Sequence, residues 1–375
     1  MATADLPGAQ SLRILMVIDS LQIGGTERHL IGLATGLAAR GHRVSVACSV
    51  GGELRPALEQ IPVQVITLSS RVVHRRVSVV LAVKLWKLLR HGNFDIVHAH
   101  QVASATASLV AAMVSRTPVV VTEHTMAAWR GRWARCYTRW LYRSAAHCLA
   151  VSAPIGERLV HVDRVRAERV TVIPGVIFPP YPTPRRPIPE PGLIVGVLAR
   201  LHPDKGVEVF LEAVARLTEP VAAWFVIIGA GPLDHQLRRQ ATELGLNDRI
   251  RFLGARPDGP ALIGGLDILV VPSHTEGSPL VVLEAMGAGV AIIASGVGGI
   301  PDQLDQGRAG ILVPPADPAA LATALTHLIN QPHDREQLGA NARAHFTDNH
   351  HPDRMIVNVQ QTYQAILKTR AQKAS

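Results

Sequence analysis

The chain has 375 residues, of which 47% are apolar and 18% charged, and its formal net charge is +9. This composition excludes a disordered chain and a coiled coil, and because single hydrophobic cores stop growing at roughly 250–300 residues, two domains are expected. The positive charge favours acidic partners, either nucleotide diphosphates, anionic membrane surfaces or nucleic acid, without selecting one of them.

Short runs rich in β-branched residues alternate with amphipathic segments from the start of the sequence. The predicted strands of the first half are Arg13–Ile18, Arg43–Cys48, Val63–Leu68, Asp95–His98, Pro118–Thr122, His147–Val151 and Val170–Ile173. Parallel strands need long connections and helices on both faces, so this alternation predicts a doubly wound α/β domain. We place it at residues 1–175.

A proline-rich segment, residues 176–192, follows this domain and is interpreted as a linker, since closely spaced prolines prevent regular structure. The alternation then resumes with predicted strands at Leu193–Leu198, Ala223–Ile228, Arg249–Leu253, Asp267–Val271 and Val290–Ala294, which places a second doubly wound domain at residues 193–352. An apolar stripe predicts a final helix, 353–370, that could pack on the first domain. Ligands of such sheets bind at the carboxyl ends of the strands, so the expected active site is a cleft between the domains.

Cysteine usage and apolar stretches bear on where the protein is located. Cys48, Cys136 and Cys148 show no C-x-x-C spacing, so we expect neither a disulfide framework nor a structural zinc site, and we expect all three to be buried. No apolar stretch approaches the roughly 20 residues of a membrane span. The N-terminal segment lacks the basic region of a secretory signal, and we expect a cytoplasmic protein.

The predicted strand Asp267–Val271 is followed by the sequence PSHTEGSP and then by a predicted helix, whose first turn suits Pro279. The backbone amides of Gly277, Ser278 and Leu280 would then lie at the positive end of the helix. This makes the loop a candidate phosphate site.

Two carboxylates accompany this loop. Glu276 lies in the loop and Glu284 eight residues later on the helix, so they could touch different parts of one ligand. The alternative is that Glu276 is a solvated loop residue and Glu284 a surface residue. The apolar run around Glu284 weakens this alternative, because an unpaired carboxylate there would be costly, whereas ribose hydroxyls would provide hydrogen-bond partners.

The E-x7-E pattern after V-P-S, with G-S-P-L following the first glutamate, resembles the signature of family 4 retaining glycosyltransferases. Further matching segments appear in the order of that family: Gly24–Glu27, Val97–His100, Thr122–His124, Val151–Ser152, Gly196–Gly206 and Gly298–Asp302. The resemblance spans nearly the whole chain. It implies a GT-B fold, in which two Rossmann-like domains enclose the active site.

The resemblance also implies roles for particular side chains. Arg200 and Lys205 would grip the diphosphate of the donor, and two cations placed just after a strand suit a leaving diphosphate on physical grounds as well. Glu276 would contact the transferred sugar, Glu284 the ribose hydroxyls, and His124 the sugar from the opposite domain. Taken alone, His124 would rather be interpreted as a structural histidine.

Glycines complete the donor site that the resemblance implies. Gly24 and Gly25 would let the backbone approach the diphosphate, and Gly229 would lie near the nucleotide, with a plain turn as the alternative. Two positions depart from the family pattern: the segment Ile173–Val176 lacks the usual asparagine, and Asp302 stands where a glutamate is usual. Neither departure touches the diphosphate grip.

The sequence does not favour metal-dependent catalysis. It contains no D-x-D pair, and His98, His100 and His124 do not fall on one helix face with the spacing of metal ligands. We therefore expect neither a metal ion nor another cofactor. The family is usually described as reacting on one face of the sugar, with the leaving diphosphate oxygen taking the proton of the acceptor, so the protein would supply positioning and charge stabilisation.

Two basic segments bear on membrane association. In Met126–Ala146 an aromatic face adjoins a face of arginines, and Arg71–Arg90 mixes basic residues with valine, leucine and tryptophan. Such segments suit an anionic bilayer surface, and the acceptor would then be lipid-linked, in the synthesis of a cell-surface glycan or glycolipid. The alternative is a helix packed on the core with its arginines in water.

The expected donor is a hexose linked to UDP or GDP, and two other functions are alternatives. A nucleotide-sugar epimerase of the same fold would bind the same donor but consume it without an acceptor. A basic nucleic-acid-binding module is favoured by the charge but opposed by an aromatic content of 4% and by the lack of a recognition motif, so no nucleic-acid partner is expected.

Overall fold

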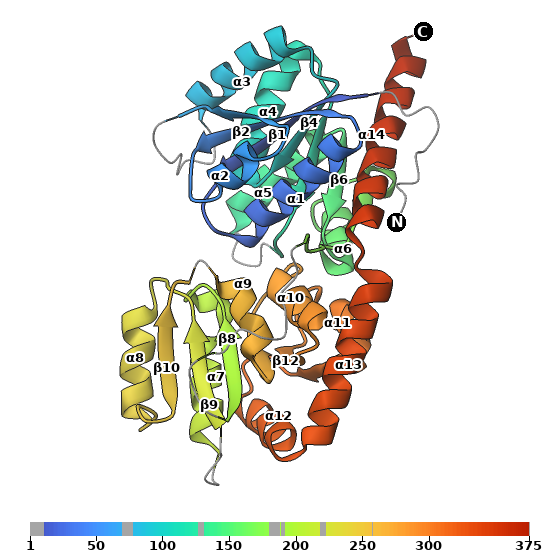
Figure 1. Ribbon diagram of the computed structural model, residues 1–375. Coiled ribbons are helices and arrows are strands. Elements are labelled where there is room, and N and C mark those ends of the chain that lie inside the picture. The colour runs from blue at the N-terminus through green and yellow to red at the C-terminus, as the bar shows by residue number, and fades with distance from the viewer. Residues whose placement is uncertain are drawn as a thin grey trace. The chain divides into compact units, whose positions relative to one another are not determined.

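The computed structural model describes residues 11–69, 78–126, 131–179, 188, 192–217, 223–256 and 258–374, apart from the side chains of residues 132, 133, 373 and 374. The chain divides into two compact units. Unit 1 comprises residues 1–173 and 353–375, and unit 2 comprises residues 174–352 (Figure 1).

Unit 1 is built around a sheet of seven parallel strands in the order β3-β2-β1-β4-β5-β6-β7. The strands are β1 Arg13–Ser20, β2 Arg43–Val50, β3 Gln64–Thr67, β4 Ile96–His100, β5 Val119–Glu123, β6 His147–Ala150 and β7 Val170–Val172. The helices are α1 Gly25–Ala39, α2 Arg55–Glu59, α3 Val79–Gly92, α4 Val102–Ser115, α5 Arg132–Ser144, α6 Ala153–His161 and, at the end of the chain, α14 Pro352–Ala374. Every residue of β4 and β5 is buried, as expected where helices cover both faces of a parallel sheet.

The C-terminal helix α14 belongs to unit 1, although it follows unit 2 in the sequence. Its Ile356 lies against Gly36 of α1, and the hydroxyl of its Tyr363 lies 2.6 Å from Nδ1 of His98 on β4. Tyr363 and His98 are both fully buried. The helix therefore contributes to the core around the central strands rather than to the surface alone.

Unit 2 contains a second parallel sheet of six strands in the order β10-β9-β8-β11-β12-β13. The strands are β8 Leu193–Leu198, β9 Ala223–Ile228, β10 Ile250–Gly254, β11 Ile268–Val271, β12 Ala291–Ser295 and β13 Ile311–Val313. The helices are α7 Val207–Ala215, α8 Asp234–Glu243, α9 Gly259–Leu262, α10 Leu280–Ala288, α11 Ile300–Gln303, α12 Pro318–Asn330 and α13 Pro332–Asn349. The sequence predicts all of these strands except β13.

One expectation about the cysteines was wrong. Cys48 and Cys148 are buried, but Cys136 is exposed on α5. That helix turns Leu141 and Tyr142 toward the core and leaves position 136 in solvent.

The strand order reverses beside the first strand of each sheet, between β1 and β4 in unit 1 and between β8 and β11 in unit 2. Connections that leave neighbouring strands at such a point turn to opposite faces, so the carboxyl ends of these strands are where ligands of doubly wound sheets bind. Functional side chains are therefore expected at the carboxyl ends of these two neighbouring strands. We call this part of each unit its reversal edge.

Candidate functional site

The reversal edge of unit 2 brings together the loops that follow β8 and β11. The loop after β8 carries Arg200, which is exposed, and ends in a short 3-10 turn whose last residue is Lys205. The backbone amide of His274, in the loop after β11, donates a 2.9 Å hydrogen bond to the carbonyl of Asp204. This bond joins the two loops that hold the predicted cationic and acidic groups.

Lys205 and Glu276 form an ion pair at this edge. The distance from Lys205 Nζ to Glu276 Oε1 is 2.8 Å, and the same carboxylate oxygen accepts a 2.8 Å hydrogen bond from Ser273 Oγ. The Glu276 side chain is only 9% exposed, so the pair is largely shielded from water. A fixed cation and a fixed carboxylate at one point can bind a diphosphate and a sugar hydroxyl, respectively.

The loop that carries Glu276 is fixed by the segment before α11. A Cβ atom on Gly298 would lie 1.9 Å from the carbonyl oxygen of Glu276, and the residue has a φ of +56°, so only glycine fits there. The amide of Gly299 donates a 2.9 Å hydrogen bond to the carbonyl of Gly277. The side-chain amide of Gln303 donates to Ser278 Oγ at 3.1 Å.

Helix α10 begins at Leu280, with Pro279 as its N-cap rather than within its first turn. The first N–H groups of a helix have no partner within the helix and carry partial positive charge, so the start of α10 suits a phosphate. Glu284 is the fifth residue of α10 and only 4% exposed. The alternative that Glu284 is a surface residue is thereby excluded.

Gly229, a predicted donor-site residue, lies just after β9 at the same edge. A Cβ atom there would lie 1.8 Å from the carbonyl oxygen of Ala199, and its φ is +144°. The glycine therefore lets the chain after β9 pass directly over the end of β8.

The reversal edge of unit 1 joins the loops after β1 and β4. Gly24 is the N-cap of α1, Gly25 is its first residue, and the Glu27 carboxylate folds back over Gly24. Gln101, which follows β4, bridges the two elements on either side of the first loop: its Nε2 donates to Glu27 Oε1 of α1 at 2.9 Å, and its Oε1 accepts from the amide of Asp19 in β1 at 3.1 Å. Its φ of +78° is unusual for a residue other than glycine and indicates strain of the kind found at binding sites.

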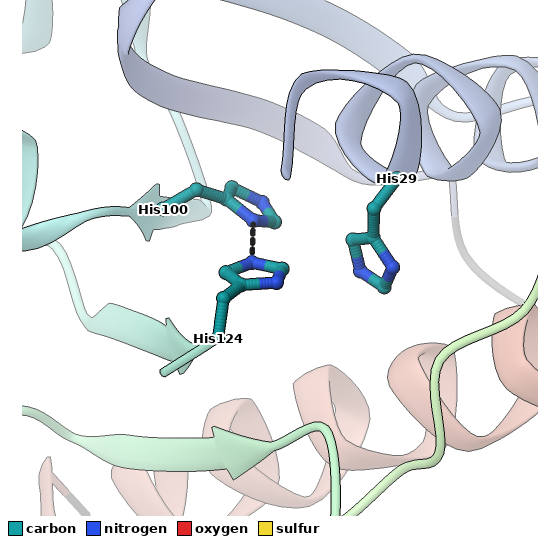
Figure 2. A group of neighbouring side chains, drawn as sticks. All are labelled: His29, His100 and His124. Atoms are coloured by element: carbon teal, nitrogen blue, oxygen red, sulfur yellow. Dashed lines mark hydrogen bonds between the residues drawn. The ribbon is translucent and has the colours of Figure 1, made fainter. Parts of the chain in front are cut away.

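Three imidazoles meet beside this edge: His29 from α1, His100 from the end of β4, and His124 from the turn after β5 (Figure 2). His100 Nδ1 and His124 Nε2 are 3.1 Å apart. Burial, aided by neighbouring imidazoles that include His98, lowers the pKa of His29 and of His124 to about 3 and that of His100 well below its usual value. The three rings are therefore uncharged at neutral pH.

The side chain of His98 fixes the orientation of the His100 ring. The ring of His98 packs on that of His100, with centroids 4.3 Å apart, and its nitrogens are held at 2.6 Å by Tyr363 and Thr122. His98 is thus a structural histidine, whereas His124 lies against His100 at the reversal edge.

The turn that carries His124 is held by Glu123. Its Oε1 accepts hydrogen bonds from the amide and the hydroxyl of Thr125 at 2.9 and 2.8 Å. Arg158 of α6 approaches its other carboxylate oxygen at 3.3 Å, which stabilises the charge of this buried group.

Sequence reasoning assigned no site role to His29, Glu27 or Gln101. The sequence excludes one-helix ligand spacing for His98, His100 and His124, whereas the structure gathers His29 from a helix with His100 and His124 from the ends of two strands. The sequence carries no direct signal for the cluster, because it depends on the strand order: β4 and β5 are neighbours and place His100 opposite Thr122, two residues before His124.

The basic segments are described only in part. Arg71, Arg75 and Arg76, and residues 127–130, lie outside the described residues. On α5, Arg135, Trp140 and Arg143 are exposed. No helix within the described ranges is long and apolar enough to cross a bilayer.

Solved structures similar to this chain share the fold of both units. Anabaena Alr3699/HepE in complex with UDP and glucose gives a TM-score of 0.81 at 24% identity and covers 94% of this chain and 99% of its own. Sucrose-phosphate synthase of Thermosynechococcus elongatus gives 0.76 at 21% identity, with coverage of 96% and 100%. The two Rossmann-like units are those of the GT-B fold.

Sequence comparisons agree with this fold. The model described as Glycosyltransferase Family 4 matches residues 23–179, and that described as Glycosyl transferases group 1 matches residues 183–345. A D-inositol 3-phosphate glycosyltransferase of Corynebacterium efficiens is 32% identical over 286 residues, 68% of this chain and 67% of the relative. A glycogen synthase of Mycobacterium tuberculosis is 28% identical, with 90% of each chain covered. With the acidic loop of unit 2 and the cations beside it, these matches show that the chain belongs to the family 4 glycosyltransferases.

Proposed function

We propose that the protein transfers a hexose from a UDP- or GDP-linked donor to an acceptor hydroxyl, with retention of anomeric configuration and without a metal ion. The observation that carries the proposal is the 2.8 Å ion pair of Lys205 and Glu276, which joins the predicted diphosphate-binding and sugar-binding groups at one reversal edge. The HepE structures hold UDP, UDP with glucose, or UDP-glucose, which supports a nucleotide-sugar donor.

In the proposed reaction the bond between C1 of the sugar and the diphosphate oxygen breaks, while the acceptor oxygen bonds to C1 on the same face. The proton of the acceptor passes to the leaving diphosphate oxygen, so no base from the protein is required. Negative charge grows on the diphosphate as the sugar leaves. Arg200, Lys205 and the N-terminus of α10 stabilise that charge in this mechanism.

The remaining site residues orient the donor in the same proposal. Glu276, held by Lys205 and Ser273, accepts a hydrogen bond from a sugar hydroxyl, and Glu284 accepts from the ribose hydroxyls. His124 hydrogen-bonds the sugar. Because its pKa is about 3, it does so as a neutral imidazole and not as an acid.

We further propose that the protein binds peripherally to an anionic membrane and glycosylates a lipid-linked acceptor. On α5, Trp140 is 46% exposed between the exposed Arg135 and Arg143, and at the start of α3 Val79 and Val80 are 73% and 67% exposed. Basic groups beside exposed apolar side chains suit the interface of an anionic bilayer. The described part of α5 is consistent with this arrangement, because the helix buries Leu141 and Tyr142 and turns its basic side outward.

A donor screen tests the proposed activity. A ligand that binds only the folded state raises the midpoint of thermal unfolding, so UDP or GDP and the matching nucleotide hexoses should stabilise the protein. The donor found in this way is then incubated with and without a panel of acceptors. Conversion of the donor to its epimer without an acceptor would favour an epimerase, and a lack of stabilisation by every nucleoside diphosphate would contradict the proposal.

A further inference from the structure

The imidazoles of His29, His100 and His124 form a triangle that approaches the geometry of a metal site. One nitrogen from each ring lies within 4.8 Å of the others, and the ring centroids are 5.0, 5.5 and 5.9 Å apart. In a tetrahedral zinc site, Zn–N distances of about 2.0–2.1 Å place the ring centroids of two histidine ligands roughly 5 Å apart. Small side-chain rotations would bring the three nitrogens onto one ion.

The surroundings favour a cation over a network of hydrogen bonds alone. His100 is fully buried, so its ring nitrogens must find their partners within the protein or in a bound ion. Since His100 Nδ1 and His124 Nε2 face each other at 3.1 Å, one of them must carry a proton to satisfy the other. A metal ion would satisfy both lone pairs, and the His98 ring that packs on His100 already holds that ligand in place.

The donor set selects a class of metal. It consists of neutral imidazole nitrogens, and no carboxylate belongs to the cluster as far as the chain is described. Imidazole suits Zn²⁺, Co²⁺, Ni²⁺ and Cu²⁺, whereas Mg²⁺ and Ca²⁺ prefer oxygen ligands. Three histidines also leave a fourth position for water or another ligand.

We propose that His29, His100 and His124 bind one divalent transition-metal ion of the zinc class at the reversal edge of unit 1. On the proposed function, in which His124 bonds the transferred sugar, metal and donor sugar compete for His124. The metal is therefore an inhibitor of transfer and not a cofactor.

The test is a titration of the full chain, freed of any histidine tag, with Co²⁺ in the absence of nucleotides. We expect one equivalent to bind, with the visible absorption bands of four-coordinate Co²⁺, and to be displaced by Zn²⁺ but not by Mg²⁺. His29→Gln and His124→Gln should each weaken binding by more than the roughly 10–100-fold that loss of an outer-shell partner costs. His345→Gln is the matched control, because His345 lies beside Asp305 in unit 2, outside the cluster.

Circular dichroism and thermal unfolding establish that each variant is folded. Absence of a stoichiometric site in the folded wild type would overturn the proposal, and so would binding that neither variant in the cluster weakens. The titration needs no sugar nucleotide, so its result is independent of the proposed transfer activity. If a metal ion binds to the cluster but does not raise the KM for the donor, the metal site stands. Inhibition by the metal and the assignment of His124 to the sugar are then both contradicted.

Discussion

Lys205 and Arg200 are both assigned to the diphosphate but have different surroundings. Lys205 Nζ lies 2.8 Å from Glu276 Oε1, whereas Arg200 is exposed. Because the negative charge develops only as the sugar leaves, each cation should stabilise the transition state more than the bound donor. Lys205→Ala and Arg200→Ala should each lower kcat by about 10²–10³-fold, measured by steady-state kinetics, with a smaller change in donor affinity.

Arg200→Ala is the cleaner of these variants, because loss of Lys205 leaves the shielded Glu276 carboxylate without its cation. Circular dichroism and denaturant unfolding of Lys205→Ala measure that structural effect separately from the loss of kcat. Lys368→Ala, at an exposed position of α14, serves as the control. A near-normal kcat with only a raised KM would show that the cation binds the donor and the transition state equally. Such a result would exclude its role in stabilising the leaving group.

Glu284 is a buried carboxylate that the proposed function assigns to the ribose. Glu284→Gln keeps the shape of the side chain but removes its charge, and a hydrogen bond to a charged group contributes about 1.5–3 kcal/mol. The variant should therefore bind UDP or GDP roughly 10–100-fold more weakly in isothermal titration calorimetry, with an unchanged fold. An unaltered dissociation constant would exclude the ribose role.

The loop after β11 depends on the segment that precedes α11. In Gly298→Ala the new methyl group would meet the Glu276 carbonyl at 1.9 Å, and the residue would be held at a φ of +56°. We expect displacement of Glu276, loss of donor affinity and a stability cost of about 1–3 kcal/mol, measured by denaturant unfolding. In Gly296→Ala, two residues away, the nearest atom would be Val313 O at 3.7 Å, so this control should behave as the wild type. Equal stability and equal donor affinity of the two variants would show that Gly298 does not fix the loop that carries Glu276.

The exposed arginines of α5 allow the membrane proposal to be tested. Arg135→Glu combined with Arg143→Glu should lower binding to anionic vesicles, because each basic residue near such a surface contributes about 1 kcal/mol, and should leave nucleotide binding unchanged. Vesicle co-sedimentation measures the first effect. The same reversals at Arg216 and Arg239, exposed in unit 2, control for net charge. If the α5 variant still co-sediments with anionic vesicles as the wild type does, the arginines of α5 only face water and do not bind the membrane.

Much of the fold could be predicted from the sequence because strands β1 to β12 are apolar runs separated by helical segments. The strand β13 was missed because its apolar run is confined to three residues by a glycine before it and two prolines after it. The acidic loop of unit 2 was found because Glu276, Glu284 and their neighbours are consecutive in the sequence. The contact of Lys205 with Glu276 and the meeting of His29, His100 and His124 could not be derived, since they depend on the order of strands within each sheet.

The two units share an architecture but carry different chemistry at their reversal edges. Unit 2 presents fixed charges, the Lys205–Glu276 pair and the start of α10, which suit a nucleotide diphosphate. Unit 1 presents neutral imidazoles and the Gln101 bridge, which suit hydroxyl groups. The proposed mechanism, in which the protein supplies positioning and charge stabilisation, uses both kinds of group.

The central claim, retaining transfer without a metal ion, is tested most directly by the initial anomeric configuration of the transferred sugar. The donor found in the screen is turned over in EDTA with an acceptor from the panel, or with water if none reacts, and the product is followed by proton NMR before it can mutarotate. The account predicts undiminished turnover and a product with the anomeric configuration of the donor. An inverted product, or turnover that appears only after Mg²⁺ or Mn²⁺ is added, would contradict it.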